Sequence, residues 1–382
     1  MASIGLLLPG STLYPSIGID FLQGIKTCFS YHQANEVTFH NAVAGFGLNE
    51  EELYKEAEKL LLVHDVDILV IYAEDHLAKT LGKLFAAAGK LLVIVNAGAH
   101  YPAVNSGNDH TLFNLLNDSL CAYLTGQLCQ QSTPNKSAIS ATSYYDGGYQ
   151  HAHAMGNAFE AAGGAIRFNF ISHYKKQAFT IQPLAAFIQS NPEVNTLLCL
   201  YSGDMARCFY EQVAPLQKQY NLQLFGSPML FDSTPGDFTE THPYVQHIQG
   251  YTPWVPVLDN PDNNNFIQLF KKAHHKAANL FTLQGWETAL LMLHYLQHKQ
   301  TGVAVPEAIE KLKKQPVQSP RGQLRINNSN IITGPAYLVS ATGELQLQVK
   351  EVIADTTAVF DEMMQQVPDG IITSWRNTYL CI

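Results

Sequence analysis

Residues 4–26 read IGLLLPGSTLYPSIGIDFLQGIK, and the hydrophobic pattern changes its period within this stretch. Residues 4–8 are apolar and predict a buried strand that ends at Pro9. Apolar residues then recur at helical spacing over residues 16–31 and predict an amphipathic helix. Because ligands of α/β proteins bind at the carboxyl ends of the strands, we expect the loop at residues 9–15 to line a binding site.

Strand and helix patterns alternate along the rest of the chain. The runs VDILVIY (residues 66–72) and LLVIVN (residues 91–96) are continuously apolar, as expected for parallel strands covered on both faces. In the first series we also expect a strand at residues 36–40 and helices at residues 49–63 and 75–88. The second series predicts strands at residues 136–141, 165–170, 196–200 and 222–226, and helices at residues 118–130, 148–162, 181–190 and 204–220. This order predicts an α/β fold with doubly wound parallel sheets and right-handed crossovers.

A third stretch follows the two series. It predicts a strand at residues 248–253 and helices at residues 263–276 and 284–298. Because this stretch has too few strands for a third domain, we expect it to complete the first lobe.

Composition narrows the classes of function. The chain has 382 residues, too many for one ordinary core, so two domains are expected. Its formal net charge of −9 argues against a nucleic-acid-binding protein, which needs clustered Lys and Arg side chains. No apolar run reaches the roughly 18 to 20 residues that cross a bilayer.

Motifs of cofactor enzymes and metal sites are missing. The loop after the first strand has no Gly-x-Gly-x-x-Gly run, and the chain has neither a phosphate-binding Gly-x-x-x-x-Gly-Lys loop nor a Gly-x-Ser-x-Gly elbow. His151 and His153 are two apart on an expected helix, so they face different sides and do not form a metal pair. The six cysteines lack metal-binding spacing, and we expect buried structural thiols. These observations favour a non-enzymatic protein without cofactor or metal.

Several segments resemble the type I periplasmic solute-binding proteins, the branched-chain amino-acid-binding family of transport receptors. The first stretch matches the family's Gly-x-Leu-x-Pro strand, and Gly18, Phe21 and Gly24 match its Gly-x-x-Phe-x-x-Gly helix. Further similarity lies in SYYDGGYQHAHAMGNAFEAAGGAI, NPDNNNFIQLFKKAHH, LQGWETALLML and SPRGQLRINNSNIITGPAYLV. These matches keep the family's order across nearly the whole chain.

The resemblance implies two α/β lobes, joined by a three-strand hinge, that close over a ligand. Carried onto this chain, the first lobe takes residues 1–120 plus 249–330. The second lobe takes residues 121–248 plus 331–382. The family also implies the substrate-binding component of an ABC importer, which docks on a membrane permease when the lobes are closed.

The candidate ligand-binding residues follow the expected strands. They are Ser11, Tyr14, Tyr72, Ala73, Glu74, Asn96, Ala97, Gly98 and Ala99 in the first lobe; Tyr145, Tyr149, Ser202 and Asp204 in the second; and Tyr251 and Trp254 in the returning segment.

Structural roles compete with ligand binding at several of these positions. Asp75 and Asp204 start expected helices, where an N-cap is the commoner role. Tyr145 and Tyr149 could line an aromatic site or pack at a turn, and Trp254 could pack near the hinge. Glu74 has no capping role, so it remains a candidate for ligand contact.

Two loops depart from the family pattern. Family members carry Gly-Pro-x-Ser-Ser and Ser-Pro-x-Ala-Thr at these loops, and this chain has IYAED and VNAGA. In amino-acid-binding relatives those hydroxyls help to hold the ligand's carboxylate and ammonium groups. With Ala73, Glu74, Asp75, Ala97 and Gly98 in their place, a ligand with a cationic, amide or hydroxyl group, or a larger aromatic ligand, fits at least as well as an amino acid.

Two other readings remain open. The fold could serve as a ligand-sensing module that acts through a separate signalling partner, and an enzyme is the less favoured class. The resemblance implies a periplasmic protein. Because Met1 leads directly into the first strand, we expect its signal segment to be absent from this chain.

Overall fold

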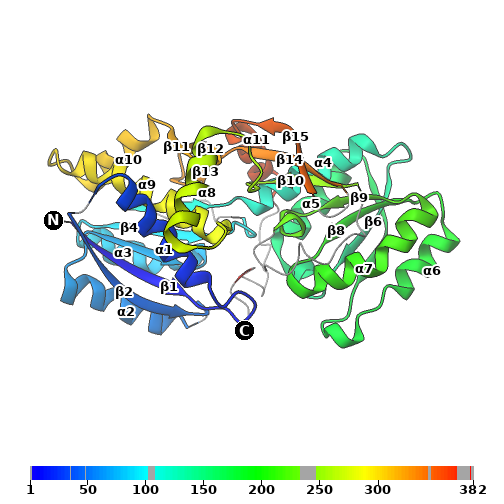
Figure 1. Ribbon diagram of the computed structural model, residues 1–382, viewed down its shortest axis with the longest axis horizontal. Helices are drawn as coiled ribbons and strands as arrows, with labels where there is room; N and C mark the ends of the chain where they lie inside the picture. Colours follow the sequence, from blue (N-terminus) through cyan, green and yellow to red (C-terminus); the bar gives the residue numbers. More distant parts are fainter. Residues whose placement is uncertain are drawn as a thin grey trace.

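Two sheets organise the chain, and Figure 1 shows the two resulting α/β lobes side by side. This computed structural model describes residues 2–34, 36–47, 49–101, 108–232, 247–342, 346–367 and 379. The predicted fold class, α/β with two doubly wound lobes, is confirmed.

The first lobe is built on a parallel sheet of order β2-β1-β3-β4-β5. Its strands are β1 (Ala2–Pro9), β2 (Val37–Gly45), β3 (Ile68–Tyr72), β4 (Leu91–Asn96) and β5 (Thr111–Leu115). Its helices are α1 (Ile17–Tyr31), α2 (Glu50–His64), α3 (Ala78–Ala87), α8 (Pro261–His274), α9 (Leu280–Lys299) and α10 (Val305–Lys313). All residues of β3, β4 and β5 are buried, as the continuous apolar runs predicted for β3 and β4.

Strand β5 was not predicted, because polar side chains interrupt its apolar run. Thr111 and Asn114 are fully buried within it, and the Asn114 amide donates a hydrogen bond to the Thr288 hydroxyl on α9 over 2.9 Å. In the sequence alone, a buried Asn resembles a loop residue, because its hydrogen-bond partner lies on a helix far along the chain.

The second lobe is built on a sheet of order β15-β14-β10-β9-β8-β6-β7. Its strands are β6 (Ser137–Thr142), β7 (Ala165–Ile171), β8 (Thr196–Leu200), β9 (Gln223–Gly226), β10 (Ile248–Thr252), β14 (Ala336–Thr342) and β15 (Gln346–Ile353). The helices of this lobe are α4 (Asp118–Ser132), α5 (Gln150–Ala161), α6 (Gln182–Ser190), α7 (Gly203–Tyr220) and α11 (Thr357–Gln365). Short 3-10 turns are η2 (Asp146–Gly148), η3 (Lys176–Ala178) and η4 (Pro228–Phe231), with η1 (Asp75–Leu77) in the first lobe.

Strand β10 corrects one expectation. The sequence led us to expect residues 248–253 to complete the first lobe, but β10 pairs parallel with β9 and antiparallel with β14 in the second sheet. The apolar pattern predicted the strand itself correctly, but it contains no information about the neighbouring strand. The full lobe boundaries given above stay a prediction.

The chain crosses between the two sheets at residues 116–117, 253–260 and 334–335. A small antiparallel sheet of β11 (Val317–Ser319), β12 (Gly322–Ile326) and β13 (Ile332–Thr333) precedes the last of these crossings.

Two glycines allow α1 and α9 to pack closely. A Cβ atom on Gly24 would lie 2.1 Å from the carbonyl oxygen of Thr282, and one on Gly285 would lie 2.1 Å from that of Phe21. Each helix therefore presents bare backbone to the other. This contact fixes the start of α9 beside the loop after β1, where the candidate site lies.

Helix ends agree with the sequence in one case and differ in another. Asn49 is the N-cap of α2 as predicted, and its side chain accepts a hydrogen bond from the Glu52 amide over 3.2 Å. The helix expected at residues 75–88 instead begins with the η1 turn, which is capped at Glu74, so Asp75 is not an N-cap.

Candidate functional site

Tyr14 and Tyr72 meet at the carboxyl ends of the first-lobe strands. Tyr14 lies in the loop after β1, and its ring contacts Phe281 at the start of α9, with centroids 5.6 Å apart. Tyr72 ends β3, and its ring lies 6.4 Å from the same Phe281 ring. All three side chains are buried, so the helix start and the two loops form one aromatic wall.

Ser11 and Asn96 hold this wall in place. The Ser11 hydroxyl accepts a hydrogen bond from the Tyr14 amide over 3.1 Å. The Gln284 side chain bridges β3 and β4, because it accepts from the Tyr72 hydroxyl and donates to the Asn96 carbonyl, over 2.7 and 2.8 Å. The Asn96 side chain spans the same two loops. These polar groups hold the loops in position. The aromatic rings form the wall of the candidate site.

The loop of Ala97, Gly98 and Ala99 is bonded to the second lobe. The carbonyl oxygens of these residues accept hydrogen bonds from the amides of Asp118, Ser119 and His151, respectively, over 3.1, 2.8 and 2.9 Å. Gly98 has φ +70°, and a Cβ there would lie 2.8 Å from the Asn117 nitrogen, so the loop requires glycine. Ala73 is likewise engaged, since its amide donates to the Val95 carbonyl.

In the second lobe, a buried aspartate organises the loop ends. Asp146 accepts a hydrogen bond from the Ser143 hydroxyl and two bonds from the hydroxyl and amide of Ser202, over 2.7 and 2.9 Å. Burial raises the pKa of Asp146, and these hydrogen bonds oppose that rise. The Ser202 hydroxyl is thus already engaged within its own lobe.

Tyr149 and His151 extend the boundary between the lobes. Their rings stack with centroids 5.7 Å apart, and His100 meets the Tyr149 ring edge-on. Both Tyr149 and His151 are buried, and burial lowers the pKa of His151 to about 3, with His100 as a second cause.

Tyr145 and Asp204 lie at the surface. Tyr145 is 43% exposed, and its ring meets Tyr144 edge-on. Asp204 forms an exposed ion pair with Lys176 over 3.0 Å. Because α7 is capped at Ser202, the expectation that Asp204 is an N-cap is wrong.

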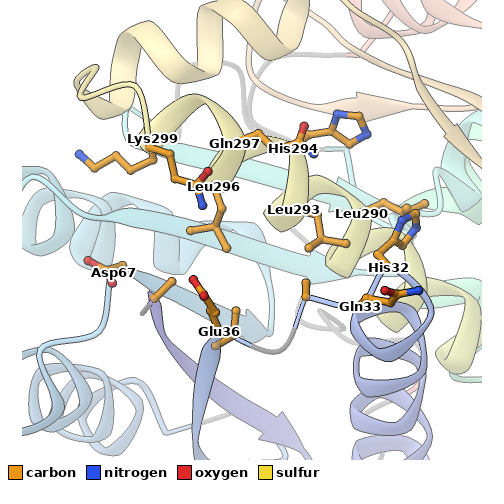
Figure 2. A pocket seen from close by; sticks show the side chains of 14 residues that line it. His32, Gln33, Glu36, Asp67, Leu290, Leu293, His294, Leu296, Gln297 and Lys299 are labelled. Atoms are coloured by element: carbon orange, nitrogen blue, oxygen red, sulfur yellow. The ribbon is translucent and has the colours of Figure 1, made fainter.

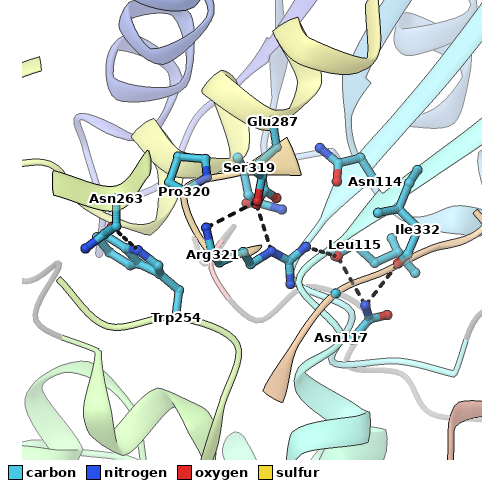
Figure 3. A network of polar contacts seen from close by, with 12 residues as sticks. Asn114, Leu115, Asn117, Trp254, Asn263, Glu287, Ser319, Pro320, Arg321 and Ile332 are labelled. Carbon is cyan, nitrogen blue, oxygen red and sulfur yellow. Dashed lines mark hydrogen bonds and ion pairs between the residues drawn. The ribbon is translucent and has the colours of Figure 1, made fainter. Parts of the chain in front are cut away.

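Tyr251 and Trp254 are packed inside. Tyr251 belongs to β10, where its amide donates to the Thr125 hydroxyl over 2.8 Å. The Trp254 indole donates to the Asn263 side chain over 2.8 Å (Figure 3). Its ring also packs edge-on against Phe266. These contacts agree with the packing role that the sequence left open for Trp254.

Two buried aspartates were missed by the sequence analysis. Asp118 is the first residue of α4, just after β5, and Asp232 follows η4, just after β9. Asp118 is 1% exposed, and its Oδ2 atom has no hydrogen-bond partner among the described residues. Applying the strand-end rule to β5 and β9 would have found both side chains.

Burial and neighbouring charge raise the pKa values of both Asp118 and Tyr72. The pKa of Asp118 lies well above its usual range because of burial and then Asp232, whereas Arg321 opposes the shift. Burial also raises the pKa of Tyr72, and Asp118, Glu74 and Asp232 add to this rise. Glu74 is itself buried. Acidic groups of both lobes therefore raise the pKa of the tyrosine that ends β3.

Tyr379 completes the site. Its ring lies 5.1 Å from Tyr14 and 5.2 Å from Phe281, and it is almost fully buried. We call Tyr14, Tyr72, Asp118, Asp232 and Tyr379 the central cluster. Tyr379 could not be predicted from the sequence, because it follows no expected strand.

Arg321 and Glu287 form a buried ion pair (Figure 3). Arg321 Nε donates to Glu287 Oε1 over 2.8 Å, and its guanidinium also donates to the Leu115 carbonyl over 3.3 Å. The Ser319 hydroxyl donates to the same glutamate oxygen. Arg321 thus connects α9 and β5 to the segment between β11 and β12. This segment lies close to a crossing between the lobes.

A separate groove lies at the opposite ends of the first-lobe strands (Figure 2). It has a volume of about 870 Å³ and is lined by the starts of the first strands and by side chains of α9, among them His32, Glu36 and His294. None of the candidate ligand-binding residues lines it. The groove is therefore distinct from the central cluster.

Within the described ranges, no group of three or more His, Cys, Asp or Glu side chains is placed to hold a metal ion. No helix in this part of the chain combines the length and apolar character for crossing a membrane. Of the cysteines that the structure describes, Cys28, Cys121, Cys129 and Cys199 are buried free thiols, whereas Cys208 is only partly buried.

Comparison with solved structures supports this architecture. A substrate-binding protein of an ABC transporter from Sphaerobacter thermophilus superimposes with a TM-score of 0.76 at 17% identity, covering 93% of this chain and 98% of that one. A solute-binding protein from R. palustris in complex with benzoate gives a TM-score of 0.72 at 20% identity, covering 93% and 97%. A branched-chain amino acid ABC transporter ligand-binding protein from Burkholderia xenovorans gives 0.72 at 14% identity, covering 94% and 96%. At these identities the likeness shows the fold.

Sequence comparison assigns the family. No curated protein sequence matches the chain. The model of the periplasmic binding protein family matches residues 2–344, which is most of the chain. The chain therefore belongs to the type I periplasmic binding proteins, the branched-chain amino-acid-binding family.

Proposed function

We propose that the chain is the substrate-binding component of an ABC importer and holds a small aromatic or polar solute between its lobes. The observation that carries this proposal is the central cluster, in which buried rings pack against Phe281 at the strand ends of the first lobe. Asp118 and Asp232 of the second lobe are close enough to raise the pKa of Tyr379. The family supports the same role, since its members include solute-binding proteins of ABC transporters. A periplasmic location and a permease partner follow from this role.

The aromatic wall favours an aromatic solute over an aliphatic amino acid. The loops that hold an amino acid in relatives lack hydroxyls here, and the carbonyls of residues 97–99 are bonded to the second lobe. Apolar ring contacts with a few polar groups are typical of small-molecule sites. The solved benzoate complex of a structurally similar protein is consistent with a ring-binding cleft.

Ligand binding would bias the two lobes toward a closed arrangement. The bias cannot exceed the difference between the solute's affinities for the open and closed states. No enzymatic role is proposed, because solute binding needs only the contacts described above.

A thermal-shift screen tests the proposal. The panel contains amino acids, polyamines, sugars, aromatic acids and aromatic amines. A solute at about 100 times its Kd stabilises the protein by about 2.7 kcal/mol, which raises Tm by a few degrees. A shift from one chemical class supports the binding role, whereas no shift from any class, in a sample that mass spectrometry shows to be ligand-free, contradicts it.

A further inference from the structure

The loop after β4 in the first lobe contacts the start of α5 in the second lobe. The His151 amide donates to the Ala99 carbonyl over 2.9 Å, and the Tyr101 amide donates to the Gln150 side chain over 2.5 Å. The loop and the helix belong to different sheets, so these hydrogen bonds join the two lobes. We call the contact between residues 99–101 and residues 149–153 the α5 contact.

His151 is the buried histidine of the α5 contact. Its side chain is 1% exposed, and its ring stacks on Tyr149 at an interplanar angle of 19°. Neither ring nitrogen has a hydrogen-bond partner among the described residues. A proton added to this ring would therefore place a charge between the lobes with neither water nor an acceptor to stabilise it.

The titratable groups that face His151 cannot compensate such a charge. They are Tyr149 from its own lobe and His100 from the first lobe, which meets the Tyr149 ring edge-on with centroids 6.3 Å apart. Burial lowers the pKa of His151 to about 3, and His100 is the second cause. No carboxylate of the described residues, on α4 or elsewhere, contributes to this shift of the pKa.

Helix α5 is held in its own lobe by α4. A Cβ atom on Gly126 of α4 would lie 2.2 Å from the carbonyl oxygen of Met155 on α5, so the two helices pack backbone to backbone. If the α5 contact opens, the helix stays with the second lobe and the loop of the first lobe separates from it.

We propose that the α5 contact is a pH-sensitive switch, in which protonation of His151 separates residues 99–101 from α5 while both lobes stay folded. Once the imidazole reaches water, its pKa returns to its usual value of 6.5. The contact is therefore fully stable above about pH 6.5 and opens up to about tenfold more readily for each pH unit below it. This opening needs no solute, so it holds whether or not the proposed function does.

Hydrogen exchange of the full chain without added solute tests the inference. Mass spectrometry reads the amide protection of peptides from the α5 contact and from β3 and β4, at pH 7.5 and 4.5, with each rate corrected for the intrinsic effect of pH. Protection at the α5 contact should fall by about a hundredfold between these pH values, as for one proton bound only in the open form. Strands β3 and β4 should stay more protected than the α5 contact at both pH values, because the opening is local.

Two variants assign the effect to one histidine. His151→Gln keeps a polar side chain that does not titrate, so it should remove most of the fall in protection. His153→Gln is the matched control, because His153 lies on the same helix and contacts Tyr101 but is exposed, so its charge reaches solvent. This control should keep the pH dependence of the wild type.

Three results overturn the inference. They are protection at the α5 contact that does not change with pH, a fall that persists unchanged in His151→Gln, and protection equal to that of β3 and β4 at both pH values. The last result would mean that the contact opens only when the whole protein unfolds. The first and third are read from the wild type alone, so the test stays decisive even where His151→Gln does not fold.

Discussion

Glu287 and Arg321 form a salt bridge of 2.8 Å from which solvent is excluded, between α9 and the segment that follows β11. Removing one partner of such a pair leaves a buried charge without compensation. We expect Glu287→Ala to lower the free energy of unfolding by about 3–5 kcal/mol, measured by urea denaturation.

The exposed pair of Arg207 and Glu211 on α7 is the matched control for this prediction. Its atoms lie 3.1 Å apart, but both side chains are substantially exposed. Glu211→Ala should therefore cost no more than about 1 kcal/mol. Equal losses in the two variants would show that the buried pair does not stabilise the crossing between the lobes.

At Gly285, helix propensity favours alanine, but the close contact between α1 and α9 favours glycine. Alanine is preferred over glycine in helices by about 1 kcal/mol, but a Cβ on Gly285 would clash with the Phe21 carbonyl. We expect Gly285→Ala to destabilise the protein by about 1–3 kcal/mol because backbone must move. Gly156→Ala on α5 is the control, because its Cβ would lie 3.4 Å from Ile166 Cδ1, an ordinary contact. A rise in Tm for both variants would contradict the close packing of α1 and α9.

Burial of His151 predicts that stability falls with acid. Its pKa is lowered from 6.5 to about 3 in the folded state, so below about pH 6.5 the unfolded chain binds a proton that the folded chain does not. The stability from this group is present above pH 6.5 and falls as the pH drops toward 3, with a slope approaching about 1.4 kcal/mol per pH unit. The groups that face it are Tyr149 and His100.

Urea midpoints measured from pH 7.5 to pH 4.5 test this slope. His151→Gln should flatten it relative to the wild type, because the titrating group is gone. His275→Asn, at an exposed position with a left-handed backbone, should keep the wild-type slope. Parallel curves for all three proteins would mean that His151 does not control the acid response.

Asp118 also predicts proton release on binding of a cationic solute. The raised pKa of Asp118 keeps its carboxyl protonated over a wider pH range, and a bound cation would lower that pKa. Protons would then leave on binding, and affinity would rise with pH. The charged and titratable groups that interact electrostatically with Asp118 are Asp232, Arg321, Tyr72, Tyr379 and Cys121.

Calorimetry in two buffers of different ionisation enthalpy measures this release. The heat of phenethylamine binding should depend on the buffer in the wild type and much less in Asp118→Asn. Proton uptake, or a buffer dependence that persists unchanged in the variant, would assign the linkage to another group.

Elements with a clear period were predictable from the sequence, and side chains brought together by the fold were less so. Continuous apolar runs predicted β3 and β4, whereas buried Thr111 and Asn114 concealed β5. Missing β5 also hid Asp118, which follows that strand. Strand order depends on long-range pairing, and for this reason the placement of β10 was wrong.

Candidate site residues show the same limit. Tyr14 and Tyr72 were predicted and do lie together in the central cluster. Ser202, Asn96 and Ala99 follow strands as expected, but their polar groups are engaged by Asp146, Gln284 and His151. A strand-end rule finds the right edge of a sheet, but it cannot tell which groups are already satisfied there. Ligand contact by these residues stays a prediction.

A crystal structure grown with the solute that the thermal-shift screen selects tests the central claim most directly. The account predicts solute density between the lobes, in contact with Tyr14 and Phe281 on one side and with Asp118 and Asp232 on the other. Solute bound instead in the groove beside His32 and His294 would contradict it.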